Sequence, residues 1–466
     1  MYFPITIFLI YSTHMVRIPI KARMAPSPTG FLHVGTAQSA IFNYLFAKKS
    51  DGEFHVRIED TDEERSSKEF ESDILEGFKW LGLDWDGPIT RSSDNKKEYR
   101  KYLEQLLSSG KAFWCNHSKE ELEREQKEQM AKKEPPRHVC AHKHEGLPSG
   151  QVLRLRVNDQ SDREIIFDDV IRGRVSFRES LLGDISIARN LDSPLFHFAV
   201  VIDDIAMEIS HILRGEDHIS NTPKHILIYE ALEKDIPQYA HLPLLLAPDR
   251  SKLSKRTGIV SLNEYKKDYL PEVIFNFLAT LSHTYSQEIL SKEELIKEFD
   301  LKKIHKSGAV FDIKKLNWLN SQYIKRLSPS EFKKVVANEK ISDMAVPIIT
   351  ERLEKLSDVK EFDFLWEEAE YPKELLLWKT SSFNDVKMSL MEVLGSFKAK
   401  TALNASELRE SLDALGKEKG DRGLVYWPLR VALSGREKSP DPIQIAEVLG
   451  REEVMERIKT ALEKIE

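Results

Sequence analysis

Cysteine, net positive charge and long apolar runs are all scarce in this sequence of 466 residues. The two cysteines, Cys115 and Cys140, are too few for a disulfide framework in a chain of this length and suit a reducing compartment. The formal net charge of −7 argues against nonspecific coating of nucleic acid, because neutralising phosphates requires clustered lysine and arginine. We therefore predict a cytoplasmic protein that meets any RNA partner through local basic patches.

The apolar stretch at the N-terminus, MYFPITIFLIYS, is too short to cross a membrane. It lacks a basic leading segment, a small-residue cleavage site and the roughly 20 residues that a membrane span needs. We predict that residues 1–14 form an extension outside the fold and that the protein has no membrane partner. Both Met1 and Met15 remain possible starts of the chain.

The common nucleotide-binding motifs are also missing. No G-x-x-x-x-G-K-[ST] segment occurs, and no G-x-G-x-x-G segment follows a predicted strand, which argues against phosphate-loop enzymes and dehydrogenases. Neither a low-complexity tract nor a fixed-period repeat is present, and the length favours several domains. The starting hypothesis is therefore a multidomain globular enzyme.

Hydrophobic periodicity predicts an α/β protein with a Rossmann-like parallel sheet, an α+β insertion and an all-helical C-terminal part. Strand and helix patterns alternate at the start of the chain, change to antiparallel-type strands after a charged helix, return, and give way to amphipathic helices. The predicted parts are the first half of the α/β domain over 15–109, an inserted module over 110–200, the second half of the α/β domain over 201–260, and two helical domains over 261–328 and 329–466.

Two short segments have the residues expected at a nucleotide site. In ARMAPSPTGFLHVGTAQSA, Gly30 and Gly35 let a ligand approach the backbone where a helix begins, so free N–H groups can face phosphate. In PDRSKLSKRTG, four basic residues lie in one loop: Arg250, Lys252, Lys255 and Arg256. A basic loop alone is usually a solvated surface, so its meaning depends on the first segment.

Taken together, HVGT and KLSKR resemble the paired signatures of class I aminoacyl-tRNA synthetases. RMAPSPTGFLHVGT, FHVRIEDTDEERS, HILRGEDHISNTP, KLSKRTG, AVFDIKKLNWLN and WPLRVALSG occur in the order found in glutamyl-tRNA synthetases, over nearly the whole chain from Arg23 onward. The resemblance implies ATP-dependent ligation of L-glutamate to tRNA(Glu) through a glutamyl-adenylate, with Mg²⁺ assisting.

The resemblance also implies a nucleotide site. His33 matches the first histidine of the HIGH tetrapeptide, whose last position is Thr36 here, and Lys252 and Lys255 match the mobile cations that approach the triphosphate. His33, Lys252 and Lys255 are the expected catalytic residues. The expected ATP-binding set is Pro26, Gly30, His33, Gly35, Lys252, Ser254 and Lys255.

A glutamate pocket must neutralise a side-chain carboxylate and recognise an ammonium group, which requires arginine and an acid. Arg23 and Arg214 are the expected carboxylate ligands, and Glu59 is the expected acceptor from the ammonium group, although each alone could be a structural ion pair. Phe196 departs from the family, which often has tyrosine there, so a hydroxyl contact is absent. The expected glutamate-binding set is Arg23, Ala25, Ser27, Glu59, Phe196, Val200, Arg214 and His218.

The insertion contains a candidate zinc site. Cys115-x-His117 and Cys140-x-His142-x-His144 have a spacing that can bind zinc tetrahedrally, and some glutamyl enzymes carry zinc in this module. Their first pair is usually Cys-x-Cys, so His117 is a substitution, and His138 is an alternative to His142. The expected ligands are Cys115, His117, Cys140 and His142, with a metal-free surface as the alternative.

The helical C-terminal third distinguishes the related possibilities. Lys302, Lys303, His305 and Lys306 precede a segment that the resemblance assigns to the tRNA stem, and the distal helices resemble a bacterial anticodon-binding part. A glutamine-charging enzyme would have β-barrels there, and a truncated relative that modifies a nucleotide would lack this third. An inactive tRNA-binding paralogue is disfavoured by the retained signature residues. Whether tRNA(Gln) is also charged stays open, and a monomer is expected.

Overall fold

A parallel β-sheet forms the centre of the N-terminal part in the computed structural model, which describes residues 19–62, 64–253, 261–398 and 404–466. Its order is β11-β10-β1-β2-β3. Successive strands proceed outward on both sides of β1, so the strand order reverses between β1 and β10, a position where α/β sheets bind ligands. The strands are β1 (Lys21–Met24), β2 (Glu53–Ile58), β3 (Thr90–Arg91), β10 (His211–Gly215) and β11 (Gln238–Leu242).

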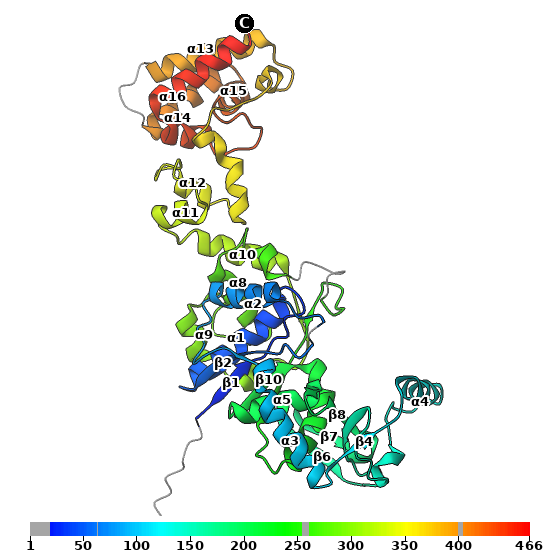
Figure 1. Ribbon diagram of the computed structural model, residues 1–466. Helices are drawn as coiled ribbons and strands as arrows, with labels where there is room; N and C mark the ends of the chain where they lie inside the picture. Colours follow the sequence, from blue (N-terminus) through cyan, green and yellow to red (C-terminus); the bar gives the residue numbers. More distant parts are fainter. Residues whose placement is uncertain (1–18, 63, 254–260, 399–403) are drawn as a thin grey trace, which may run out of the picture. The chain divides into compact units, whose positions relative to one another are not determined.

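Alternation along the strands explains how helices cover both faces of this sheet. Phe54 of β2 contacts Tyr44 of α1 (Val34–Lys49), whereas Arg57 contacts Asp204 of α5 (Phe196–Ala206). Because residues an odd number of positions apart point to opposite faces, α1 and α5 lie on opposite sides of the sheet. Figure 1 shows α1 and α5 beside β1, β2 and β10. The other helices of this part are α2 (Lys68–Trp80), α3 (Lys96–Ser108) and α6 (Thr222–Ala231).

The segment between α3 and α5 forms the predicted α+β module. A four-stranded antiparallel sheet has the order β4-β5-β8-β9, and β6 and β7 form a separate hairpin. The charged helix α4 (Lys119–Ala131) begins with a capping box at Ser118 and buries none of its residues. The strands are β4 (Ala112–Cys115), β5 (Val152–Leu155), β6 (Glu164–Asp169), β7 (Gly173–Arg178), β8 (Ile185–Asn190) and β9 (Ser193–Pro194).

The chain divides into two compact units, the first of which contains both sheets just described. The first unit covers 1–265 and 274–312, and the second covers 266–273 and 313–466. In the first unit, the two-residue strand β13 (Ala309–Val310) pairs with β12 (Leu245–Leu246). Both strands are too short to show periodicity in the sequence. The remaining helices before Asp312 are α7 (Leu262–Tyr265) and α9 (Lys292–Glu298), whereas α8 (Pro271–Thr280) contributes to both units.

The second unit is helical in the part that the structure describes. Helix α15 packs against α13, α14 and α16, and leucine, valine and phenylalanine side chains fill the space between them. Gly450, with φ of +80°, interrupts α16 and bends the chain there. Its helices are α10 (Ile313–Ile324), α11 (Pro329–Val335), α12 (Val346–Thr350), α13 (Phe383–Lys398), α14 (Ala405–Glu418), α15 (Gly423–Ser434) and α16 (Pro442–Lys464).

Candidate active site and metal centre

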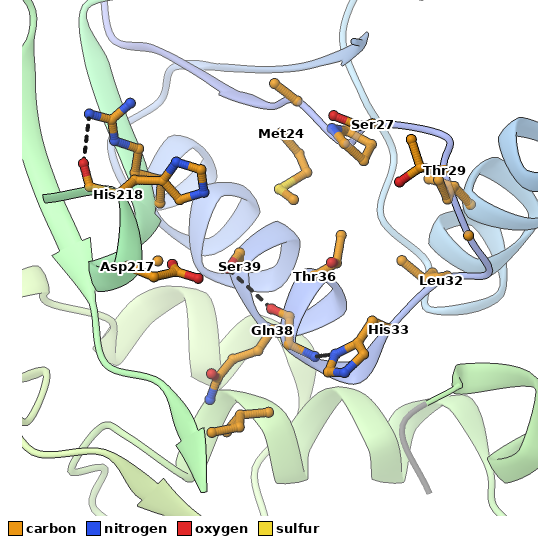
Figure 2. Close-up of a pocket in the computed structure, with 18 of the residues that line it drawn as sticks. Met24, Ser27, Thr29, Leu32, His33, Thr36, Gln38, Ser39, Asp217 and His218 are labelled. Atoms are coloured by element: carbon orange, nitrogen blue, oxygen red, sulfur yellow. Dashed lines mark hydrogen bonds between the residues drawn. The ribbon is translucent and has the colours of Figure 1, made fainter. Parts of the chain in front are cut away.

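A cavity of about 1430 Å³ opens at the carboxyl ends of β1, β2 and β10. Figure 2 shows its walls, which include the loop after β1, the start of α1 and the segment after β10. The nucleotide and glutamate residues expected from the sequence line this one cavity: Arg23, Ala25, Pro26, Ser27, Gly30, His33, Gly35, Glu59, Phe196, Val200, Arg214, His218 and Lys252. Ser254 and Lys255 lie outside the described residues, as does the predicted extension over 1–14.

His33 caps the N-terminus of α1. The backbone N–H of Gly35 donates to His33 Nδ1 at 3.0 Å, so the neutral ring carries its hydrogen on Nε2. A side chain at position 35 would place its Cβ 3.2 Å from His33 Nδ1, a tight contact that the imidazole would have to relieve by moving. The first turn of α1 contains no acidic residue, so helix N–H groups and the imidazole together favour an anion.

Lys252 of the basic loop and the described residues from 261 onward contribute to this wall. Lys252 Nζ lies 3.0 Å from Asp217 Oδ2 at the cavity, and the Leu262 N–H donates to the Leu32 carbonyl at 2.9 Å. Asp73 of α2 accepts from the Leu32 N–H at 2.6 Å and from the Asn263 side chain. The sequence reasoning missed Asp73, which ties the HVGT segment to the residues that follow KLSKR.

A buried network of charges lies beneath the cavity. Arg23 donates from Nε and Nη2 to the two oxygens of Asp204, at 3.0 and 3.1 Å. Arg57 is fully buried, and it donates to Asp204 at 2.5 Å and to Glu59 at 2.9 Å. Asp203 accepts from Ser92, Asn95 and Tyr99. Three carboxyl groups, those of Glu59, Asp203 and Asp204, thus share the network with two guanidinium groups.

The pKa values in this network follow from burial and from these partners. Burial raises the pKa of Glu59, although Arg57 opposes the shift. For Asp204, burial also acts to raise the pKa, but Arg23 and Arg57 outweigh it and the pKa is lowered. Burial acts to lower the pKa of Arg57, yet Asp204, Glu59 and Asp203 raise it. Asp204 and Arg57 are therefore charged in the folded protein.

Arg214 has entirely different surroundings. Its Nη2 donates to Thr222 Oγ1 at 2.7 Å, its Nη1 lies 3.2 Å from His225 Nδ1, and its Nε donates to His241 Nε2 at 3.3 Å. No carboxylate pairs with Arg214 among the residues that the structure describes, and burial lowers its pKa. A guanidinium that faces a cavity without an internal anion is suited to bind an anionic group of a ligand.

Four side chains of the insertion converge in the manner of metal ligands. The candidate donor atoms of Cys115, His117, Cys140 and His142 all lie within 4.8 Å of one another. His117 Nδ1 lies 3.4 Å from Cys115 Sγ and 3.6 Å from Cys140 Sγ, and His142 Nδ1 lies 3.5 Å from Cys140 Sγ. Usual zinc bond lengths in a tetrahedron hold sulfur and nitrogen ligands roughly 3.5 Å apart, so these residues fit zinc.

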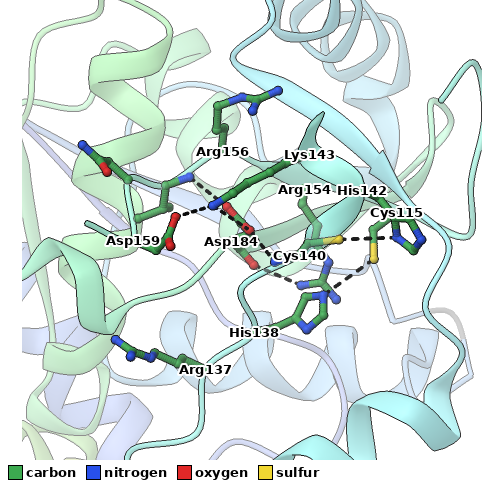
Figure 3. Close-up of polar contacts among 12 residues, drawn as sticks. Cys115, Arg137, His138, Cys140, His142, Lys143, Arg154, Arg156, Asp159 and Asp184 are labelled. Atoms are coloured by element: carbon green, nitrogen blue, oxygen red, sulfur yellow. Dashed lines mark hydrogen bonds and ion pairs between the residues drawn. The ribbon is translucent and has the colours of Figure 1, made fainter. Parts of the chain in front are cut away.

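The surroundings of the cluster hold its loops and activate a thiol (Figure 3). Asp184 accepts from the Cys140 N–H at 2.8 Å and from the Val157 N–H at 3.0 Å. His138, the alternative ligand, lies 3.8 Å from Cys115 Sγ with its Nε2 and pairs with Glu125 through Nδ1 at 2.6 Å. Burial acts to raise the pKa of Cys115, but hydrogen bonds from His138, Arg154 and His117 lower it to about 4.

Comparison with known proteins identifies two family domains in the chain. The catalytic-domain profile of class I tRNA synthetases (E and Q) matches residues 19–318, and an anticodon binding domain profile matches residues 286–462. The chain is 39% identical to the glutamate–tRNA ligase of Carboxydothermus hydrogenoformans, over 94% of this chain and 99% of that protein. The chain belongs to the glutamate–tRNA ligase family.

Other members of the glutamate–tRNA ligase family give the same result. The Aquifex aeolicus glutamate–tRNA ligase is 40% identical over 96% of this chain and 99% of its own length. A crystal structure of a glutamate tRNA ligase from Elizabethkingia meningosepticum, in complex with its amino acid, superposes with a TM-score of 0.84. That protein is 32% identical, and the match covers 96% of this chain and 100% of the other.

These findings confirm the predicted family, its class I aminoacyl-tRNA synthetase activity and the α/β fold with a helical C-terminal region. The predicted domain boundaries and the roles of individual site residues stay predictions. In the part of this glutamate–tRNA ligase family member that the structure describes, no helix is long and apolar enough to cross a membrane. Sequence reasoning missed Arg57, Asp204, His225 and His241, although two adjacent acids in the apolar segment FAVVIDDIA were a signal for the charge network.

Proposed function

We propose that this chain joins L-glutamate to tRNA(Glu) through a glutamyl-adenylate and that the cavity at the carboxyl ends of β1, β2 and β10 is its active site. The observation that carries the proposal is the shared lining: residues of the expected nucleotide and glutamate sets border one cavity. A carboxylate oxygen of glutamate attacks the α-phosphorus of ATP, pyrophosphate leaves, and a hydroxyl at the end of the tRNA then takes the glutamyl group from AMP.

The nucleotide lies at the start of α1 in this proposal. His33 donates from Nε2 to a phosphate oxygen, because its Nδ1 is already occupied by the Gly35 N–H. The N-terminus of α1 adds stabilisation for negative charge, and Mg²⁺ supplies further charge neutralisation when it accompanies ATP. Lys252 starts from its ion pair with Asp217 at the edge of the cavity. The main contribution of His33, Lys252 and the start of α1 is to position ATP and stabilise the phosphoryl group in the transition state.

Glutamate is recognised by charge. Arg214 receives the side-chain carboxylate, because its described partners are neutral hydroxyl, imidazole and carbonyl groups. Glu59, which lines the cavity, accepts from the ammonium group. Arg23 contributes Nη1 to a substrate carboxylate, since Asp204 occupies its Nε and Nη2. Phe196 and Val200 provide an apolar wall, without the hydroxyl that tyrosine would add.

Zinc in the insertion is the second part of the proposal. Cys115, His117, Cys140 and His142 would hold the ion, and its contribution is structural because all four tetrahedral positions are then taken by protein ligands. His138 acts outside the ligand set by donating to the Cys115 thiolate. The cytoplasmic location stays part of the proposal, since the two cysteines are free thiols. A monomer remains the expected oligomeric state.

The test is aminoacylation with labelled glutamate and ATP on purified tRNA(Glu) and, separately, tRNA(Gln) from the source organism. Charging of tRNA(Glu) alone supports the proposal and makes the enzyme discriminating. Charging of both tRNAs supports it and makes the enzyme nondiscriminating, so that an amidotransferase must act downstream. Charging of neither tRNA contradicts it and favours a tRNA-binding paralogue.

A further inference from the structure

Neutral side chains form a second layer behind Arg214. His225 from α6 and His241 from β11 approach two of its nitrogens, and Thr222 approaches the third. His225 and His241 are fully buried, and none of these three residues lines the cavity itself. They therefore act on a ligand through Arg214 and not by contact.

Burial lowers the pKa of both imidazoles, and their hydrogen-bond partners orient them. Asp169 Oδ2 lies 2.6 Å from His241 Nδ1, so that nitrogen carries the hydrogen and Nε2 is left to accept from Arg214. His225 accepts from Arg214 at Nδ1 and donates from Nε2 to His197 Nδ1 at 3.1 Å. Burial and the charge of Arg214 keep the pKa of His225 well below its usual value. Burial also lowers the pKa of His197 to about 4.

The other groups in contact with Arg214 are neutral as well, whereas Arg23, Asp204 and Glu59 act on it only through longer-range charge interactions. The Tyr239 ring lies with its centroid 5.3 Å from the Arg214 guanidinium carbon, and the His218 carbonyl lies 3.5 Å from Nη2. Burial raises the pKa of Tyr239 and lowers the pKa of His218. The nearest ionised carboxylate behind this layer, Asp169, is separated from Arg214 by the His241 ring. Arg23 and Arg57, which are less exposed than Arg214, have carboxylate partners in direct contact.

We propose that His225, with His241 and Thr222, forms a neutral cradle that positions Arg214 and denies it an internal anion, so that the cradle sets the preference for anionic glutamate over neutral glutamine. The inference rests on the proposed function, because it assumes that Arg214 meets the substrate side chain. His225 is a positioning residue here. Neutral acceptors orient the guanidinium without neutralising it, whereas a carboxylate at the same point would compete with the substrate.

The experiment compares His225→Asn with His225→Asp, which are nearly equal in size and differ in charge. Asparagine can accept from Arg214 and donate to His197, as histidine does. The measured quantities are the KM for glutamate in tRNA charging and the inhibition constant of glutamine against glutamate. Because charge-assisted contacts account for roughly tenfold or larger changes in affinity, we expect His225→Asp to lower the ratio of the glutamine constant to the glutamate KM at least about tenfold.

His225→Asn should leave that ratio within about threefold of the unaltered enzyme, since it keeps a neutral acceptor. Equal effects of the two substitutions, or an unchanged ratio in His225→Asp, would overturn the cradle. Thr222→Asp and Thr222→Asn approach Arg214 from the Nη2 side and give the same contrast if His225→Asp does not fold. Failure of the unaltered enzyme to charge tRNA with glutamate contradicts the proposed function instead, so the two failures are distinguishable.

Discussion

Arg23 and Arg214 line the same cavity, but their hydrogen-bond partners indicate different roles. Arg23 is held by both oxygens of Asp204, next to the equally buried Arg57, whereas Arg214 is surrounded by imidazole, hydroxyl and carbonyl groups. The first arrangement satisfies its charges within the protein and stabilises the floor of the cavity. The second leaves a cation with no carboxylate in direct contact among the described residues, so that an anionic group of a ligand can pair with it. The role of an arginine in a pocket can thus be inferred only when the positions of its counter-charges are known.

The largest expected effect is on stability, from Asp204→Ala. Removing this carboxylate leaves Arg23 and Arg57 buried with less negative charge, and breaking a buried ion pair costs about 3 to 5 kcal/mol. Urea unfolding should show a large loss of free energy. Asp192→Ala is the matched control, because Asp192 pairs with Arg100 at the surface and its loss should have little effect. An equal loss of unfolding free energy in both variants would contradict the inferred difference between the buried and the surface ion pair.

Arg214→Gln should have the second-largest effect, and it should fall on activity. We expect kcat/KM for glutamate to drop roughly a hundredfold, because a charged hydrogen-bonded contact to the substrate is lost. The urea midpoint should change little, since no carboxylate loses its partner. Arg214→Lys keeps the positive charge but not the paired hydrogen bonds of a guanidinium. Its kcat/KM should therefore lie between those of the unaltered enzyme and Arg214→Gln. A loss of stability as large as that of Asp204→Ala would show that Arg214 is structural.

The cysteine and histidine cluster extends the comparison to a group of donors that needs a cation. Purified without chelator, the protein should contain about one zinc per chain by metal analysis, and Cys140→Ser should abolish it. His144→Ala is the control, because His144 is exposed and lies outside the converging set. Protein without stoichiometric zinc would refute the metal assignment and leave a hydrogen-bonded cluster.

The smallest expected effect comes from Phe196→Tyr in the apolar wall of the cavity. A hydroxyl that reaches the substrate should lower the KM for glutamate by about two- to tenfold, as one neutral hydrogen bond does. Steady-state charging at varied glutamate concentration measures the effect. An increase in KM would indicate that position 196 is apolar because the neighbouring His218 and His225 rings pack against it.

The sequence led to the cavity lining because those residues lie within contiguous segments that resemble a family. The sequence could not reveal the partners that determine the charge state and orientation of these residues. Arg23 and Asp204 are 181 positions apart, and Arg214 and His241 are 27 positions apart. No local period connects such positions. Asp73 illustrates the same limit, since its contacts with Leu32 and Asn263 arise only when α2 packs beside the start of α1.

The sequence by itself determined the alternation of strands and helices, the charged helix of the insertion and the set of residues available for chemistry. These properties depend on periodicity and residue type, which a linear chain displays directly. Tertiary structure alone decided which buried charges neutralise one another and which remain for a ligand. The physical reason is that electrostatic energy depends on distance and on burial, and both are set by which segments the fold brings together.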